Sequence, residues 1–478
     1  MMLYIDGEWK AGQRKEFFTV INPATSDEIG EVANAEKIDA EIAVDAASRA
    51  FVTWSQTTPY QRAKYLSDAY DLMIERKEEI AQLMSKEQGK PLKASRNEVQ
   101  YGADFLLWFA EEAKRVYGKV IPSARKNQRF ISIKQPVGVV GAITPWNYPV
   151  SMLTRKLAPA LAAGCTVVLK PAEQTPLCAK AVIEIFHDVG VPKGVVNLLT
   201  TENAEEIGQV LLTDRRVKKI TFTGSTAVGK KLAAKAAEQV KSISMELGGH
   251  APFLVLKDAN PEHAAKGVSL IKYLNTGQAC ISPNRIFVHE SVADEFIAVL
   301  KERVEKLKPG SGLDETVTIG PLVNRAEVEK VDNQVKDAKE KGAKVITGGS
   351  ILTDENLSKG NFYAPTILSG VTEEMKIYRE ETFGPVAPII IYTDQDDIFA
   401  MANDTHYGLA AYVYTENLSA AMHAFEALNF GIIGINDINP TSAAAPFGGM
   451  NESGLGREGA REGIEEYLET KLGGFQLN

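Results

Sequence analysis

Apolar and polar positions divide this chain into a long helical stretch followed by two series of alternating strands and helices. From residue 36 to 116, apolar side chains recur at intervals of three and four, which predicts amphipathic helices. In the segment Arg129-Phe-Ile-Ser-Ile-Lys-Gln-Pro, apolar and polar residues alternate, which is typical of a strand. We therefore expect mainly helices before residue 116 and a separate strand shortly after it.

Short apolar runs alternate with helical segments between residues 166 and 247. The pattern predicts strands at 166–169, 195–199, 220–222 and 242–247, with helices at 177–189, 204–212 and 227–239. Such alternation indicates right-handed βαβ units and a parallel sheet with helices on both faces, so the fold class is α/β. The run Gly248-Gly-His-Ala-Pro is a predicted hinge. A second series of strands follows it, at 253–256, 285–289, 344–346 and 388–392.

The end of the chain suggests contact with another subunit. A helix is predicted at 463–469, followed by Gly473-Gly-Phe-Gln-Leu as a possible edge strand. An edge strand left open is an aggregation hazard, so we expect it to pair with a second copy.

Composition and charge exclude several classes of protein. A chain of 478 residues is too long for one core, so two or three domains are expected. The net charge of −9 argues against a nucleic-acid partner, and no run reaches the ~18 apolar residues that a membrane helix needs. We find no secretory signal and only three cysteines, which favours a reducing, cytoplasmic location. The six histidines lack ligand spacing, so no metal is expected.

Cys280 is the first residue that could carry chemistry. In Asn275-Thr-Gly-Gln-Ala-Cys280 it follows a glycine just past a helical stretch, where a thiolate can meet backbone amides and act as a nucleophile. Most cysteines, however, are small buried hydrophobes. We give Cys165 and Cys178 that interpretation.

Glu246 and Asn147 are candidates for a base and an oxyanion donor. Glu246 ends an apolar strand before two glycines, where open α/β sheets place their ligands, and burial there would raise its pKa. It could instead be a strand-end carboxylate bonded to loop amides. Asn147 lies in the rigid segment Thr144-Pro-Trp-Asn-Tyr-Pro, which could fix its amide as an N–H donor. Otherwise it is a turn residue.

Two segments could hold a nucleotide. Phe222-Thr-Gly-Ser-Thr-Ala-Val-Gly229 follows a strand and opens a helix, as phosphate-binding turns do, although its Gly-x4-Gly spacing is neither the dinucleotide fingerprint nor a P-loop. Lys170-Pro-Ala-Glu173 also follows a strand directly. Its side chains could bond ribose hydroxyls or could be ordinary surface charges.

Together with two further segments, these motifs resemble the aldehyde dehydrogenase superfamily over essentially the whole chain and in the family's order. The matching segments are Pro145-Trp-Asn-Tyr-Pro, Lys170-Pro-Ala-Glu, Phe222-Thr-Gly-Ser, Glu246-Leu-Gly-Gly, Gly277-Gln-Ala-Cys, Glu380-Glu-Thr-Phe-Gly-Pro and Pro446-Phe-Gly-Gly. The resemblance implies a Rossmann-like NAD-binding domain (1–115 and 137–248), an α/β catalytic domain (249–447) and a small β oligomerisation element (118–136 and 448–478). It also implies a homodimer or homotetramer.

The resemblance assigns a role to each site residue. Cys280 would attack the aldehyde, the Asn147 amide and the Cys280 N–H would stabilise the oxyanion, and Glu246 would activate water to hydrolyse the thioester. Lys156 matches a lysine often found behind the oxyanion site. The implied cofactor-binding residues are Trp146, Lys170, Glu173, Gly224, Ser225, Gly229, Leu247, Glu381 and Phe383.

Two carboxylates, Glu246 and Glu173, indicate which product and which cofactor to expect. Acylating relatives, which pass the acyl group to coenzyme A, generally lack the glutamate found here as Glu246, so hydrolysis to the free acid is expected. Glu173 would repel a ribose 2′-phosphate, which makes NAD the expected cofactor and NADP the less favoured one.

The substrate is suggested by Arg155 and by Ser453-Gly-Leu-Gly-Arg-Glu-Gly, which resemble the succinate-semialdehyde dehydrogenase branch. There the matching arginine helps to bind the substrate carboxylate. The chain departs from that branch at Leu274, where a second arginine is usual, and at Ser282, where a second cysteine often lies. We therefore expect a short acid semialdehyde, with a neutral aliphatic or aromatic aldehyde beside Tyr148 as the alternative.

Two other classes remain open. Cys280 could serve a hydrolase with His250 or His289 as its partner, and the chain could be a non-catalytic relative. The hydrolase would leave the segments around Lys170 and Glu381 without a role. Loss of catalysis would be expected to remove Cys280 or Glu246 first, and both are present.

Overall fold

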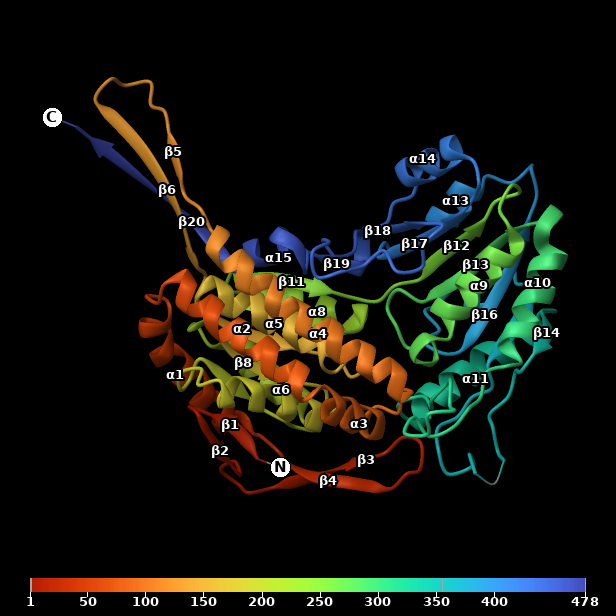
Figure 1. Ribbon diagram of the computed structural model, residues 1–478, viewed down its shortest axis with the longest axis horizontal. Coiled ribbons are helices and arrows are strands. Elements are labelled where there is room, and N and C mark those ends of the chain that lie inside the picture. The colour runs from red at the N-terminus through yellow and green to blue at the C-terminus, as the bar shows by residue number, and fades with distance from the viewer. Residues whose placement is uncertain (1, 355, 478) are drawn as a thin grey trace.

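The computed structural model describes residues 2–354 and 356–477, in which two large sheets carry most of the strands (Figure 1). Eight strands of this described part form the first sheet, in the order β19-β11-β10-β7-β8-β9-β1-β2. Their bounds are β1 (Leu3–Ile5), β2 (Glu8–Lys10), β7 (Val139–Ile143), β8 (Thr166–Lys170), β9 (Val196–Leu198), β10 (Val217–Thr223), β11 (Ser242–Glu246) and β19 (Gly454–Leu455). The strands from β11 to β9 are parallel, and β8 is buried along its whole length, as expected for the Val-Val-Leu run of a central parallel strand.

The chain reverses its direction of travel across this sheet beside β7. It runs from β7 to β8 and β9, then returns to place β10 and β11 on the other side of β7. Apolar side chains of α2–α6 form a core cluster on one face, and those of α1, α7 and α8 pack on the other. The helices are α1 (Lys37–Trp54), α2 (Pro59–Glu75), α3 (Lys77–Glu87), α4 (Leu92–Glu112), α5 (Ser151–Ala163), α6 (Pro176–Asp188), α7 (Ala204–Thr213) and α8 (Thr226–Ala237). Ligands of open α/β sheets bind at the carboxyl ends of the strands at such a reversal.

A second sheet of the described residues has the order β14-β15-β16-β13-β12-β17-β18 and is parallel except at β14. Its strands are β12 (Ala251–Val255), β13 (Pro283–His289), β14 (Lys344–Thr347), β15 (Thr366–Ser369), β16 (Val386–Tyr392), β17 (Ala410–Tyr414) and β18 (Ile432–Ile435). Helices cover both of its faces: α9 (Pro261–Lys272), α10 (Glu290–Val304), α11 (Arg325–Glu340), α12 (Lys376–Arg379), α13 (Ile398–Asn403) and α14 (Leu418–Ala427). The two series of strands expected from the sequence are thus confirmed as two α/β units.

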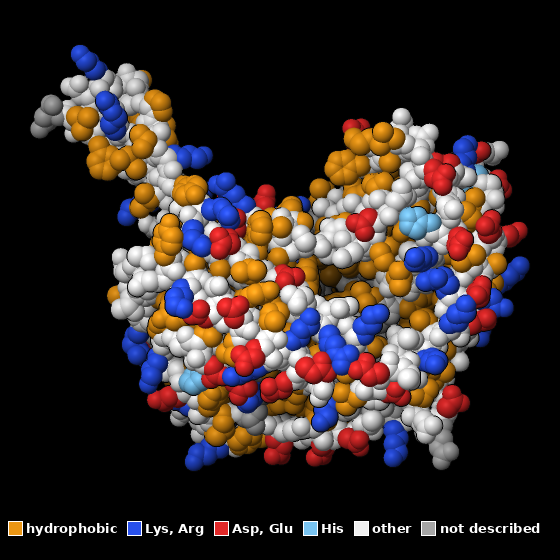
Figure 2. Space-filling view, in the orientation of Figure 1, with side chains coloured by type: hydrophobic (Ala, Val, Ile, Leu, Met, Phe, Trp, Pro, Cys, Tyr) orange, Lys and Arg blue, Asp and Glu red, His pale blue; other side chains and the backbone are white. Residues whose placement is uncertain are grey.

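A narrow arm projects from the first unit (Figure 1). It consists of β5 (Lys119–Ile121), β6 (Gln128–Pro136) and β20 (Leu468–Gln476), in the order β20-β6-β5. Hydrophobic side chains gather on it in Figure 2. The remaining elements are the hairpin β3 (Phe17–Ile21) and β4 (Glu28–Ala33), helix α15 (Ala460–Glu465), and the 3₁₀ turns η1 (Ala113–Arg115), η2 (Leu274–Gly277) and η3 (Asn451–Ser453).

The predicted C-terminal helix at 463–469 is wrong in its bounds. Helix α15 ends at Glu465, and β20 begins at Leu468, because this residue already pairs with Pro136 in the antiparallel ladder of the arm. Tertiary pairing here overrides the helical pattern. The expected edge strand is present as β20. The domain ranges stay a prediction, and β19 pairs with β11 of the first sheet although it falls in the range expected for oligomerisation.

Within the described part of the chain, no helix is long and apolar enough to span a membrane. No group of three or more His, Cys, Asp or Glu side chains among the same residues could hold a metal ion.

Candidate active site

Cys280 follows a strained turn between α9 and β13. Asn275, Thr276 and Gly277 have φ values of 48°, 60° and 75°, a left-handed conformation that costs free energy for the two residues with a Cβ. A Cβ at Gly277 would lie 2.1 Å from the carbonyl oxygen of Gly384, so only glycine fits there. The Gln278 amide holds the turn by donating to the carbonyl oxygens of Asn275 (3.1 Å) and Pro321 (3.2 Å).

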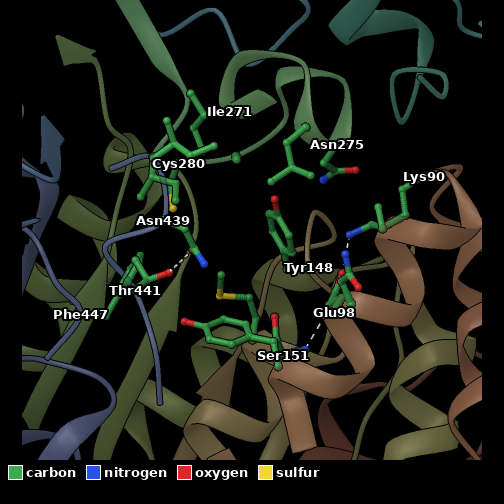
Figure 3. Close-up of a pocket in the computed structure, with 18 of the residues that line it drawn as sticks. Lys90, Glu98, Tyr148, Ser151, Ile271, Asn275, Cys280, Asn439, Thr441 and Phe447 are labelled. Atoms are coloured by element: carbon green, nitrogen blue, oxygen red, sulfur yellow. Dashed lines mark hydrogen bonds and ion pairs between the residues drawn. The ribbon is translucent and has the colours of Figure 1, made fainter. Parts of the chain in front are cut away.

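The turn presents Cys280 to a cavity of about 390 Å³ (Figure 3). Three residues predicted from the sequence line it: Cys280, Tyr148 and Arg155. Apolar and polar side chains line the rest of the cavity. They include Lys90, Glu98, Leu270, Leu274, Asn275, Ile438, Asn439, Thr441 and Phe447. The cysteine predicted to be the nucleophile and the arginine predicted to bind a carboxylate therefore line the same cavity.

The thiol and the predicted base both lie where charge is disfavoured. Burial raises the pKa of Cys280 to about 12, and the nearby Glu246 carboxylate contributes in the same direction. Burial, followed by the charge of Glu458, raises the pKa of Glu246 well above its usual range. The Glu246 Oε2 atom has no hydrogen-bond partner among the described residues. A buried carboxyl without a partner suits a general base better than a structural one.

Asn147 lies in the segment that leads into α5. Its side chain contacts the turn at residues 275–278 that precedes Cys280, which we call the cysteine turn. Its Nδ2 donates to the carbonyl oxygen of Gln278 (3.2 Å), and its Oδ1 accepts from the backbone N–H of Tyr148 (3.1 Å). An amide nitrogen carries two hydrogens, so one remains for a ligand beside Cys280.

Arg155 and Lys156, in the first turns of α5, share the carboxylate of Glu458. The Arg155 Nε lies 3.1 Å from Glu458 Oε2, and Lys156 pairs with the other oxygen while donating to the Thr221 hydroxyl (3.1 Å). The Arg155 guanidinium stacks over Phe447 at 4.1 Å, and its Nη2 has no hydrogen-bond partner among the described residues. Glu458 lies in the segment Ser453-Gly-Leu-Gly-Arg-Glu-Gly, but the sequence alone assigned this residue no role.

The residues predicted to bind the cofactor follow the carboxyl ends of β8, β10 and β11. Lys170 and Glu173 pair at 3.2 Å, outside the residues that line the cavity. The Ser225 hydroxyl caps α8 by accepting from the Val228 N–H, and the Gly224 N–H donates to the Glu246 carbonyl. The first turn of α8 therefore offers backbone N–H groups and a positive dipole end to a diphosphate.

The other cofactor residues lie between the two sheets. Gly229 packs against Leu247, and the rings of Trp146 and Phe383 meet edge to face at 5.5 Å. Glu381 Oε1 accepts from the Gly249 N–H (3.0 Å), and burial raises the pKa of Glu381 to about 7. Nearby, the buried hydroxyls of Thr223 and Thr382 have no hydrogen-bond partner in the described part of the chain. The unpartnered Thr223 hydroxyl, at the end of β10 just before the α8 N-terminus, is consistent with a polar ligand there.

Comparison with known proteins identifies the family. Residues 9–472 match the aldehyde dehydrogenase family. The chain is 47% identical to the NADP(+) succinate-semialdehyde dehydrogenase GabD of Escherichia coli strain K12 and 46% identical to a glutarate-semialdehyde dehydrogenase of Pseudomonas putida. Each alignment covers 98% of this chain and 96% of the relative. A crystal structure of an NADP-dependent enzyme of E. coli superposes with a TM-score of 0.97 at 46% identity, covering 100% of this chain and 98% of that one.

The chain belongs to the aldehyde dehydrogenase family. It is an oxidoreductase that uses NAD(P)⁺ and has the family's fold, as the resemblance implied. This family membership replaces the two other hypotheses, a Cys-dependent hydrolase and a non-catalytic relative. Neither His250 nor His289 lines the cavity with Cys280; the Nε2 of His250 lies 2.7 Å from the carbonyl oxygen of Tyr378.

The expectation that NADP is less favoured than NAD is not supported. Similar proteins are named for NADP(+) or described as NADP dependent. The structure also weakens the electrostatic argument, because the Glu173 carboxylate is paired with Lys170 and is 40% exposed, so its repulsion of a phosphate is reduced.

Proposed function

We propose that this enzyme oxidises a short acid semialdehyde, such as succinic or glutaric semialdehyde, to the dicarboxylate. The observation that carries the proposal is the buried Arg155 guanidinium, which lines the same cavity as Cys280 and has an N–H group free of protein partners. Glu458 pairs with the Nε side of this guanidinium, and the unused Nη2 donor still favours an anionic group of the substrate. The names of the relatives, which are semialdehyde dehydrogenases, support the same class.

The position of Leu274 does not remove this preference. Leu274 is 41% exposed and lines the cavity with Leu270 and Ile438, so part of the wall is apolar. The Thr441 hydroxyl donates to Asn439 Oδ1 (3.1 Å), and Figure 3 shows the Asn439 amide nitrogen directed into the cavity. A carboxylate there would meet one guanidinium and one amide, with methylene groups against the leucines.

The reaction begins at Cys280. Its thiol loses a proton to water, the sulfur bonds to the aldehyde carbon as the carbonyl π bond breaks, and the resulting oxyanion is stabilised by the free N–H of Asn147 and the backbone N–H of Cys280. When bound, NAD(P)⁺ would supply a hydride acceptor at this carbon, and the acyl group would then remain on Cys280 as a thioester. Glu246 then takes a proton from water whose oxygen attacks the thioester, and the Cys280 thiolate leaves.

The cofactor is proposed to be held at the carboxyl edge of the first sheet. Gly224 and Ser225 would approach the diphosphate at the α8 N-terminus, Lys170 and Glu173 the adenosine ribose, and Glu381 the nicotinamide ribose. Trp146, Leu247 and Phe383 would line the cleft, with Gly229 allowing Leu247 its position. Since Glu173 is already paired, we propose that both NAD⁺ and NADP⁺ are used.

The organisation of the molecule is proposed on the same basis. We infer an NAD-binding domain at 1–115 and 137–248, a catalytic domain at 249–447, and an oligomerisation element at 118–136 and 448–478. We further propose a cytoplasmic homodimer or homotetramer.

The test is an initial-rate panel with both cofactors against succinic semialdehyde, glutaric semialdehyde, butanal and benzaldehyde. We expect kcat/KM to be highest for a semialdehyde, and Arg155→Met to lower it about 10- to 150-fold, the value of one charge-assisted contact. Butanal, which lacks the carboxylate, reports any loss that comes from the fold or from the effect of Arg155 on the pKa of Cys280. The loss of about 10- to 150-fold is therefore expected in the ratio of kcat/KM for the semialdehyde to kcat/KM for butanal. Cys280→Ala is the blank. A preference for butanal or benzaldehyde that survives Arg155→Met would contradict the acid substrate and favour a neutral aldehyde.

A further inference from the structure

A buried ion pair lies beside the active-site cavity, and the proposed chemistry gives it no role. Lys90, in the turn between α3 and α4, pairs with Glu98 in α4, and each side chain is only 1% exposed. Removing two charges from water is unfavourable unless further hydrogen bonds satisfy them. The contacts that satisfy this pair therefore show what it holds in place.

The ammonium group of Lys90 contacts the segment that carries the oxyanion donor. Its Nζ donates to the backbone carbonyl oxygen of Asn147 (2.8 Å) and lies 4.1 Å from the centre of the Tyr148 ring. The same carbonyl oxygen accepts from the side-chain Nδ2 of Asn275 (2.9 Å), in the cysteine turn. Two donors thus hold the Asn147 carbonyl: Lys90, from the helical layer of the first unit, and Asn275, from the cysteine turn.

The carboxylate of Glu98 holds the other end of this segment. Its Oε1 accepts from the backbone N–H groups of Val150 (2.9 Å) and Ser151 (3.3 Å), where α5 begins. A negative charge at a helix N-terminus is favourable, so this contact also fixes the start of α5. Figure 3 shows Lys90 and Glu98 together at one side of the cavity, with Tyr148 and Asn275 between them and Cys280.

We propose that Lys90 and Glu98 form a positioning pair that holds the Asn147 amide in register with Cys280. The proposal rests on the proposed function, in which Asn147 stabilises the oxyanion. Such a donor acts only at hydrogen-bond distance from the developing charge, and a shift of about 1 Å can cost about 100-fold in rate. Neither member of the pair needs to touch the aldehyde for its loss to slow the reaction.

The experiment compares Lys90→Met with the double variant Lys90→Met/Glu98→Gln. The single change removes the donor to Asn147 and leaves the Glu98 carboxylate buried without its partner. The double change also removes that stranded charge, so it separates stability from positioning. Lys219→Met is the matched control, because Lys219 is equally buried in β10, pairs with Glu466 (3.4 Å) and does not line the cavity.

We expect Lys90→Met to lower kcat about 10- to 100-fold while KM for the aldehyde and the Kd for the cofactor stay within about threefold. The double variant should recover most of the lost Tm but none of the lost kcat. In both variants, amide hydrogen exchange over residues 147–151 should be faster than in Lys219→Met, whose kcat should stay within about threefold of the unaltered enzyme.

Recovery of kcat together with Tm in the double variant would overturn the proposal, because the loss would then come from instability. An equal loss of kcat in Lys219→Met would also overturn it. If the unaltered enzyme oxidises no aldehyde, the proposed function fails instead. The exchange of residues 147–151 still tests the pair in that case: unchanged exchange in Lys90→Met would contradict the positioning role.

Discussion

Cys280 lies in surroundings that keep its thiol protonated. Burial is the main reason that its pKa rises to about 12; the Glu246 carboxylate adds to the effect, and the Arg155 guanidinium opposes it. A thiol with that pKa is almost entirely neutral at pH 7, and only the thiolate is nucleophilic. In the free protein the nucleophile is therefore weak until a substrate or cofactor changes its surroundings or a base removes its proton.

This environment predicts the pH dependence of alkylation. In the free enzyme, the rate at which iodoacetamide modifies Cys280 should rise about tenfold per pH unit between pH 7 and 9, because the thiolate fraction grows by that factor below the pKa. Mass spectrometry of the modified peptide measures the rate. Cys280→Ala should take up no label, since Cys165 and Cys178 are buried. A plateau in the rate below pH 9 would show that burial does not raise the pKa as described.

The sequence predicts residues whose neighbours along the chain reveal them. Cys280, Glu246 and Asn147 each lie in a short segment of unusual composition, and these segments match a known family in order. Lys90 and Glu98 look like ordinary charges, and they acquire a role only through contacts with residues 57 and 52 positions away. The local sequence pattern cannot predict such contacts, because the contacts depend on how α3, α4 and α5 pack together.

At the scale of elements, α8 lies close to the segment that follows β11, where we propose that the cofactor binds. Gly229 in α8 faces Leu247, which follows β11; a Cβ added at Gly229 would lie 2.3 Å from Leu247 Cδ2. The glycine thus serves the packing of a helix on a sheet. The sequence assigned Gly229 to the cofactor through the glycine-rich turn after a strand and through the family resemblance.

We predict that Gly229→Ala displaces Leu247, raises KM for the cofactor several-fold and destabilises the fold by about 1–3 kcal/mol. Gly208→Ala is the matched control: this glycine also lies in a helix, α7, and a Cβ there would meet nothing within 4 Å. It should stabilise the protein by about 0.5–1 kcal/mol through helix propensity and leave KM unchanged. Urea unfolding and initial rates measure both. Equal KM values for the two variants would contradict the role given to the α8–β11 contact.

Most elements could be predicted because their hydrophobic periodicity extends over several residues, as in β8 and α6. The N-terminal strands could not, because they are short: β1 has three residues and meets β9 through the single pair Tyr4–Leu198. The boundary between α15 and β20 was also missed, since the strand exists only through its pairing with β6. Strand pairing between distant segments leaves no hydrophobic periodicity in either segment from which it could be predicted.

At the scale of the whole molecule, the arm exposes several large apolar side chains to solvent. Val120 in β5 is 75% exposed and Leu472 in β20 is 61% exposed, and Ile133 and Phe475 are each 49% exposed. Apolar side chains concentrated on a projecting three-stranded sheet mark a contact surface, and both outer strands keep an edge open to pairing. The described residues that line the cavity, in contrast, include none from the arm.

These two facts predict that assembly and the chemistry of the site can be separated. The unaltered enzyme should sediment at two or four times its subunit mass of 52.1 kDa, and Val120→Lys/Leu472→Lys should reduce it to the subunit mass, because charges buried in an apolar contact cost several kcal/mol. Val52→Lys, at a position 68% exposed in α1, is the control and should leave the mass unchanged. The dissociated subunit should still react with iodoacetamide at Cys280 at the unaltered rate, since η2 and β13, which flank Cys280, lie outside the arm. A monomeric unaltered enzyme would contradict the arm's role, and loss of Cys280 reactivity on dissociation would show that the site needs its neighbour.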